Sequence, residues 1–123
     1  MRDFVYLASP YTDPDKLVMQ ERYEEVCRLV AVLIKQGFAV YSPIAHNHYI
    51  ADQYNLPRDA KFWLSYDEAF LSACCFMLIA GMPGWKESIG IDKERELAEK
   101  FNKTVYLYDI ESYIISRVIR VGW

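Results

Sequence analysis

Two acidic side chains in this sequence, Glu94 and Asp67, fall on helix faces that should be buried. Apolar residues recur from Ile91 with the period of about 3.6 that marks an α-helix, and Glu94 lies on that apolar face. A second helix, predicted over residues 58–73, carries Asp67 on its apolar face. Burying an ionised carboxylate is costly unless it is paired or functional, so both acids are candidate catalytic groups. Alternatively, Glu94 interacts favourably with the helix dipole in the first turns of its helix, or both acids form ion pairs with Arg or Lys on neighbouring elements.

Two carboxyl groups that face one cleft can divide the work of breaking a glycosidic bond. One acts as the nucleophile or charge stabiliser, and the other as an acid, a base or an orienting partner. Ser88 and Gly90 stand at the start of the helix that carries Glu94. They could present a hydroxyl and backbone N–H groups to a phosphate, while Ser88 could also serve as the helix N-cap.

Further candidate binding residues lie near the N-terminus. Ser9 and Tyr11 belong to a loop that follows the first predicted strand. A phenol in such a loop could position a carboxylate or a sugar hydroxyl, or could simply be an aromatic turn residue. Arg22 interrupts an otherwise apolar helix face. It could bind a substrate phosphate, or equally form an internal ion pair with Asp67 or Glu94.

The two histidines, His46 and His48, share one side of a segment predicted to be extended. No adjacent Cys completes a metal-ligand set, so hydrogen bonding to a substrate is favoured over metal binding, with a structural role as the alternative. Neither a metal nor an organic cofactor is expected. The sequence lacks the P-loop, dinucleotide-binding, serine-hydrolase and zinc-protease motifs, which argues against those enzyme classes.

Composition is typical of one globular domain spanning residues 1–123. The chain is 53% hydrophobic and 25% charged, and its net charge of −3 argues against nucleic acid as a partner. No apolar run is long enough to span a bilayer and no signal-peptide pattern is present, so no membrane partner and a cytoplasmic location are expected. The three cysteines are interpreted as buried thiols. The high aromatic content, 15%, favours self-association.

The order of predicted elements indicates an α/β fold. Strands are predicted over residues 3–9, 38–42, 74–80 and 104–108. Helices are predicted from an Asp13 N-cap and Pro14 to a stop at Gly37, and over residues 58–73, 88–101 and 112–119. Residues 43–57 are predicted to be a loop, in which residues 49–54 could form a turn of helix. This alternation predicts three layers, α/β/α, around a Rossmann- or flavodoxin-like parallel sheet of four to five strands. Ligands of such sheets bind beyond the carboxyl ends of the strands, where the candidate residues gather.

Several segments together resemble the nucleoside 2-deoxyribosyltransferase-like superfamily. The resemblance covers most of the chain and rests on Tyr6-Leu7-Ala8-Ser9-Pro10-Tyr11, on Trp63-Leu64-x-x-Asp67, and on Ser88-Ile89-Gly90-x-x-x-Glu94 followed by Ala98 and Phe101-Asn102-Lys103. Within the superfamily, the chain looks most like the short bacterial and phage members of unknown function (DUF1937-like), which share the Pro-Gly-Trp, Ser and Gly-Ile pattern. Gly81 and Arg95 depart from the residues usual in relatives.

The resemblance implies cleavage or transfer of an N-glycosidic bond. Glu94 would match the nucleophile that attacks C1′ of a ribose or deoxyribose, Asp67 the acid that supports it, and Tyr11 the aromatic hydroxyl of the first loop. Ser88 would match the serine with which nucleotide N-glycosidases contact a 5′-phosphate. The resemblance also implies a nucleoside or nucleoside 5′-monophosphate as ligand, no cofactor, and a homodimer or larger homo-oligomer. The alternative is a ligand-sensing module that has lost turnover.

Overall fold

The computed structural model describes residues 3–57 and 59–118 of the chain. Its elements follow the order β1 (Val5–Ala8), α1 (Lys16–Lys35), β2 (Val40–Tyr41), α2 (Pro43–Gln53), α3 (Ala60–Ala73), β3 (Phe76–Ala80), α4 (Ile89–Lys100), β4 (Val105–Tyr108) and β5 (Ile115–Arg117). They form a sheet of order β2-β1-β3-β4-β5. The pairs among β1 to β4 are parallel and β5 runs antiparallel to β4. The predicted α/β class is therefore confirmed.

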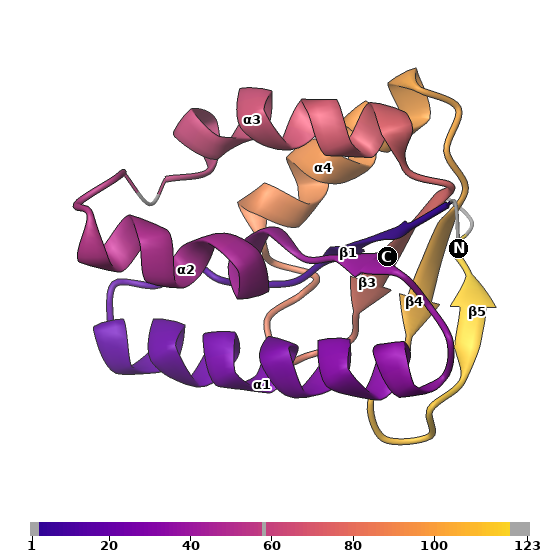
Figure 1. The fold of residues 1–123 in the computed structure, drawn as a ribbon, viewed down its shortest axis with the longest axis horizontal. Coiled ribbons are helices and arrows are strands. Elements are labelled where there is room, and N and C mark those ends of the chain that lie inside the picture. The colour runs from indigo at the N-terminus through magenta and orange to yellow at the C-terminus, as the bar shows by residue number, and fades with distance from the viewer. Residues whose placement is uncertain (1–2, 58, 119–123) are drawn as a thin grey trace.

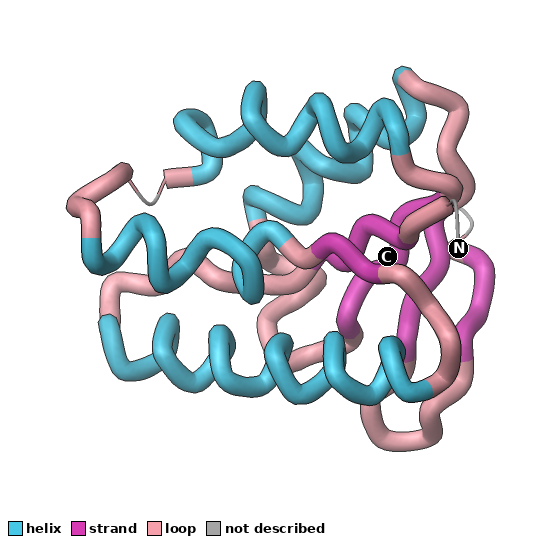
Figure 2. The backbone as a smooth tube through the Cα atoms, viewed as in Figure 1, coloured by secondary structure: helices cyan, strands magenta, loops and turns pink. Residues whose placement is uncertain are grey.

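Helices cover both faces of the sheet (Figures 1 and 2). On one face, Val5 and Leu7 of β1 pack in a core cluster with the buried face of α1, which includes Val26 and Leu29. On the other face, Tyr6 and Ala8 pack with residues of α3 and α4, including Leu71, Ile91 and Ala98. Alternate side chains of β1 thus belong to different cores, as the period of two in a strand requires. The expected three-layer arrangement follows.

The prediction for residues 43–57 was wrong, because α2 occupies most of this segment. Ser42 is the N-cap, and its hydroxyl accepts a hydrogen bond of 3.0 Å from the Ala45 N–H. Pro43 stands at the first helical position, where a missing N–H costs nothing. The weak amphipathic pattern of α2 hid a helix whose start signal was present in the sequence.

The start of α1 lies two residues later than predicted. Asp15, rather than Asp13, is its N-cap, and Asp15 Oδ1 accepts a hydrogen bond of 2.8 Å from the Leu17 N–H. Asp13 instead accepts a bond from the Asp15 N–H, which forms a turn before the helix. At the other end, Gly37 has φ of +98°, which confirms the expected left-handed residue after α1.

The predicted closing helix over residues 112–119 was also wrong. A turn in which the Tyr113 N–H donates to the Asp109 carbonyl leads into β5, Ile115–Arg117, which pairs with β4. Apolar residues at 114, 115 and 118 fit helix spacing, but the antiparallel partner strand satisfies the backbone groups here. Residue 119 lies outside the described residues.

The three cysteines also differ from the expectation that all are buried thiols, since only Cys74 is buried and Cys75 is exposed.

Candidate active site

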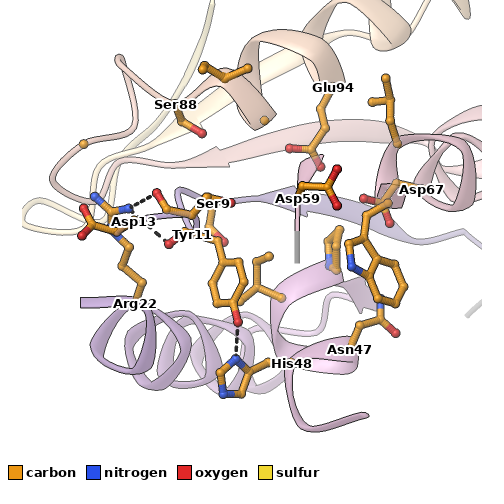
Figure 3. Close-up of a pocket in the computed structure, with 18 of the residues that line it drawn as sticks. Ser9, Tyr11, Asp13, Arg22, Asn47, His48, Asp59, Asp67, Ser88 and Glu94 are labelled. Carbon is orange, nitrogen blue, oxygen red and sulfur yellow. Dashed lines mark hydrogen bonds between the residues drawn. The ribbon is translucent and has the colours of Figure 1, made fainter. Parts of the chain in front are cut away.

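The strand order reverses at β1, which makes a topological switch point in the sheet. From β1 the chain crosses to β2 on one side, and it later enters β3 on the other side of β1. Open α/β sheets bind ligands beyond the carboxyl ends of the strands at such a point. A cavity of about 640 Å³ lies there, bounded by the loops that follow β1 and β3 and by parts of α1, α2, α3 and α4 (Figure 3). Among the predicted site residues, it is lined by Ser9, Tyr11, Arg22, His48, Asp67, Ser88, Gly90 and Glu94.

Glu94 and Asp67 meet at the buried side of this cavity, one from α4 and the other from α3. Both are buried, with relative exposures of 8% and 5%. The hydroxyl of Tyr6, in the middle of β1, donates a hydrogen bond to Glu94 Oε2 and also interacts with the Asp67 carboxyl. Tyr6 has a single proton to donate, so it cannot serve both ionised carboxylates at once.

Burial raises the pKa of both carboxyl groups. The pKa of Asp67 rises from 3.8 to about 7 because burial disfavours the charged form, although the Tyr6 hydroxyl opposes the shift. The pKa of Glu94 rises from 4.5 to about 8, first through burial and then through the nearby Asp67 charge, again opposed by Tyr6. The two groups therefore titrate as a coupled pair that retains protons at neutral pH.

Two buried polar atoms at this cavity lack a hydrogen-bond partner that a ligand could supply. Within the described residues, Asp67 Oδ1 and Ser9 Oγ are buried side-chain atoms with no hydrogen-bond partner. An unpaired buried polar atom costs about 1–3 kcal/mol. Both residues line the cavity, so a bound molecule could supply the missing partners.

Arg22 fixes the shape of the first loop. Its Nη1 donates to the carbonyl oxygens of Tyr11, at 3.3 Å, and Thr12, at 3.1 Å. Its Nη2 packs over Gly84, where an added Cβ would lie only 2.7 Å away. Among the described residues no ion pair joins Arg22 to Asp67 or Glu94, so that alternative for Arg22 was wrong. The guanidinium instead ties the loop after β1 to the loop after β3.

The structure confirms the helix N-cap role considered for Ser88, and contact with a phosphate stays a prediction. Its hydroxyl accepts a hydrogen bond of 3.2 Å from the Ile91 N–H, so it caps α4. Ser88 also lines the cavity together with Gly90. The two departures from the usual pattern of relatives do not enter the cavity lining. A Cβ at Gly81 would lie 2.9 Å from the Tyr108 carbonyl oxygen, which explains the glycine, and Arg95 lies 3.9 Å from Glu99 along α4.

The structure places the two histidines in different environments. His48 lines the cavity and its Nδ1 lies 2.6 Å from the Tyr11 hydroxyl. His46 does not line it, and its Nδ1 lies 2.9 Å from the Ser42 carbonyl oxygen, at the start of α2. The expectation that His46 contacts substrate is therefore not supported by its position. The cause is the helical, rather than extended, backbone of residues 43–53, because residues two apart on a helix point in different directions.

Sequence reasoning missed several residues of this site. Tyr6 reads as one more apolar strand residue, and only its hydroxyl, which a buried Tyr must satisfy, hinted at a polar partner. Asp59 lines the cavity at the N-cap position of α3, yet its side chain makes no capping hydrogen bond. Trp63, one turn into α3, supplies an aromatic wall.

The described residues contain no group of three or more His, Cys, Asp or Glu side chains placed to hold a metal ion. No helix within residues 3–57 and 59–118 is both long and apolar enough to cross a membrane.

Fold and site together define an α/β protein with a carboxyl-rich cavity at the switch point of its sheet. The model of one family, Domain of unknown function (DUF1937), matches residues 3–110. The chain belongs to this family. A search among curated proteins finds no match.

Proposed function

We propose that this protein cleaves or transfers the N-glycosidic bond of a nucleoside or nucleoside 5′-monophosphate, with Glu94 as the nucleophile. One observation carries the proposal: two carboxyl groups from separate helices share one tyrosine hydroxyl at the buried side of a ligand-sized cavity. The cavity volume of about 640 Å³ falls within the usual range of small-molecule sites, about 300–1,000 Å³. The resemblance to the nucleoside 2-deoxyribosyltransferase-like superfamily supports the same chemistry.

The raised pKa values fit a site that stabilises positive charge as it develops. Breaking an N-glycosidic bond gives the sugar an oxocarbenium-like character at C1′. A buried carboxylate is poorly stabilised in the empty site, but it gains most when a cation forms beside it, which is the differential stabilisation that accelerates a reaction. Glu94 then bonds to C1′ while the bond to the base breaks. Asp67, through Tyr6, holds Glu94 in position, and water or a second base completes the cycle.

The test is release of free base from a panel of nucleosides and their 5′-monophosphates, followed by chromatography. The Glu94→Gln variant should lose at least about a hundredfold in rate, as expected when a nucleophile is removed. Glu96 is exposed on the same helix, so Glu96→Gln is the matched control and should retain activity. No base release from any member of the panel by the unmodified protein would contradict the proposal.

A ligand-sensing module without turnover is the second candidate. The protonated state of the carboxyl pair at neutral pH favours it, because a protonated Glu94 is a poor nucleophile. A sensor with Glu94→Ala should keep most of its affinity for nucleosides in a calorimetric titration. An enzyme with the same change should bind but cease to release base.

Self-association stays a prediction. Exposed apolar side chains lie on α2 and at its C-cap, namely Tyr49, Ile50 and Tyr54, and on α3, namely Phe62 and Tyr66. We propose that a homodimer or larger homo-oligomer covers part of this surface, which light scattering on the purified protein would show.

A further inference from the structure

Tyr11 and His48 stand across the cavity from the carboxyl pair. Glu94 and Asp67 project from α4 and α3, which cover one face of the sheet. Tyr11 belongs to the loop after β1, and His48 projects from α2, which packs with α1. Figure 3 shows the Tyr11 hydroxyl turned away from Glu94 and toward His48. A pentose bound between the two sides would have the nucleophile on one face and this pair on the other.

A chain of hydrogen bonds fixes which nitrogen of His48 carries the proton. The Gln20 amide nitrogen donates to Glu24 at 2.9 Å, because a carboxylate can only accept. This leaves Gln20 Oε1 facing His48 Nε2, at 3.2 Å. A carbonyl oxygen also only accepts, so Nε2 must carry the hydrogen.

When the His48 ring is neutral with its hydrogen on Nε2, the other ring nitrogen, Nδ1, is an acceptor. Nδ1 lies 2.6 Å from the Tyr11 oxygen, so in this state the phenol donates to it. The ring of His48 also stacks on Tyr23, with centroids 4.0 Å apart, which holds its plane. If the imidazole gains a proton on Nδ1, this nitrogen becomes the donor and the Tyr11 oxygen the acceptor. The O–H of the phenol then turns toward the cavity without movement of heavy atoms.

We propose that Tyr11 and His48 form the acid–base relay of this site, protonating the leaving base and later deprotonating the attacking water. This inference rests on the proposed N-glycosidic chemistry. It is carried by the position of the pair opposite the nucleophile, since the leaving and entering groups of a double displacement both occupy that face.

Before the first step, the neutral His48 takes a proton from solvent onto Nδ1 and becomes the imidazolium. In the first step, Glu94 bonds to C1′, the C1′–N bond breaks, and its electron pair goes to the base nitrogen. That nitrogen takes the Tyr11 proton, while the Nδ1 proton of the imidazolium moves to the Tyr11 oxygen. In the second, water bonds to C1′ and the bond to Glu94 breaks. The water proton passes to the Tyr11 oxygen, and the phenol proton returns to Nδ1 of His48.

The activity test compares a purine nucleoside with 7-methylguanosine, whose base is already cationic and leaves without protonation. His48→Phe keeps a ring that can stack on Tyr23 but removes both nitrogens. It should slow release from the ordinary nucleoside about a hundredfold or more, and release from 7-methylguanosine less than about tenfold. Tyr11→Phe should behave alike, while Glu94→Gln should lose both activities.

Equal losses of His48→Phe on both substrates, or no loss on either, would overturn the relay and leave the proposed function standing. No release of base by the unmodified protein would overturn both. An independent readout is the nitrogen NMR spectrum of histidine side chains in the intact protein, in which His46→Gln assigns the two rings. A neutral His48 with its hydrogen on Nε2 supports the relay, and one with its hydrogen on Nδ1 refutes it.

Discussion

Raising the pH should destabilise this protein, and replacing a site carboxyl should remove much of that effect. The pKa of Asp67 is raised from 3.8 to about 7 and that of Glu94 from 4.5 to about 8. Well below pH 4 both groups are protonated in the folded and unfolded chains. As the pH rises, the unfolded chain releases these protons first, so the folded chain holds more protons and its stability falls until the pH exceeds about 8.

The magnitude follows from the pKa difference. One pKa unit between the folded and unfolded states is worth about 1.4 kcal/mol, so each carboxyl costs the fold roughly 4 kcal/mol at pH 9 relative to pH 4. Between pH 5 and 6.5 the folded chain holds about two extra protons, and the free energy of unfolding should fall by about 3 kcal/mol per pH unit from this pair. These are large amounts for a domain whose total stability is on the order of 5–15 kcal/mol.

Urea unfolding at a series of pH values measures this slope. Asp67→Asn removes one of the two titrating groups and should roughly halve the contribution of the pair. The variant should also be more stable than the unmodified protein at pH 8, although it loses a site residue. Glu96→Gln, an exposed change on α4, serves as the control and should keep the full slope. Equal slopes for Asp67→Asn and the unmodified protein, or a variant less stable at pH 8, would refute the reasoning.

Three further changes test separate parts of the structure. Tyr6→Phe removes the hydroxyl that lowers the pKa of Glu94, so any base-releasing activity should shift to higher pH, which a pH–rate profile would detect; an unchanged profile would argue against the hydrogen bond. Gly84→Ala places a Cβ 2.7 Å from Arg22 Nη2 at a φ of +92°, and should lower stability by about 1–3 kcal/mol in urea unfolding; unchanged stability would argue against this backbone conformation and this packing. Asp15→Ala removes the N-cap of α1 and should cost about 1 kcal/mol in the same assay, more than Asp13→Ala does.

The main errors in predicting the fold came from segments with weak or ambiguous periodicity. The helix α2 has a proper start at Ser42 and Pro43, but its polar and apolar residues do not form a clear stripe. Residues 112–118 have helix-like spacing of apolar residues, yet β4 offers a free edge and takes Ile115–Arg117 as an antiparallel strand. Local pattern is a weak guide where a neighbouring element can satisfy the same backbone groups.

The sequence by itself determined the α/β class and the two central acids of the site. Alternating strand and helix periods leave few other folds, and a carboxyl on an apolar helix face stands out because its burial is costly. Only the tertiary structure decided which groups these acids and the first loop meet. Tyr6 and Glu94 lie 88 residues apart, and Tyr11 and His48 lie 37 apart. Those contacts depend on strand order and on how the helices pack across the sheet, which a local pattern of residues does not encode.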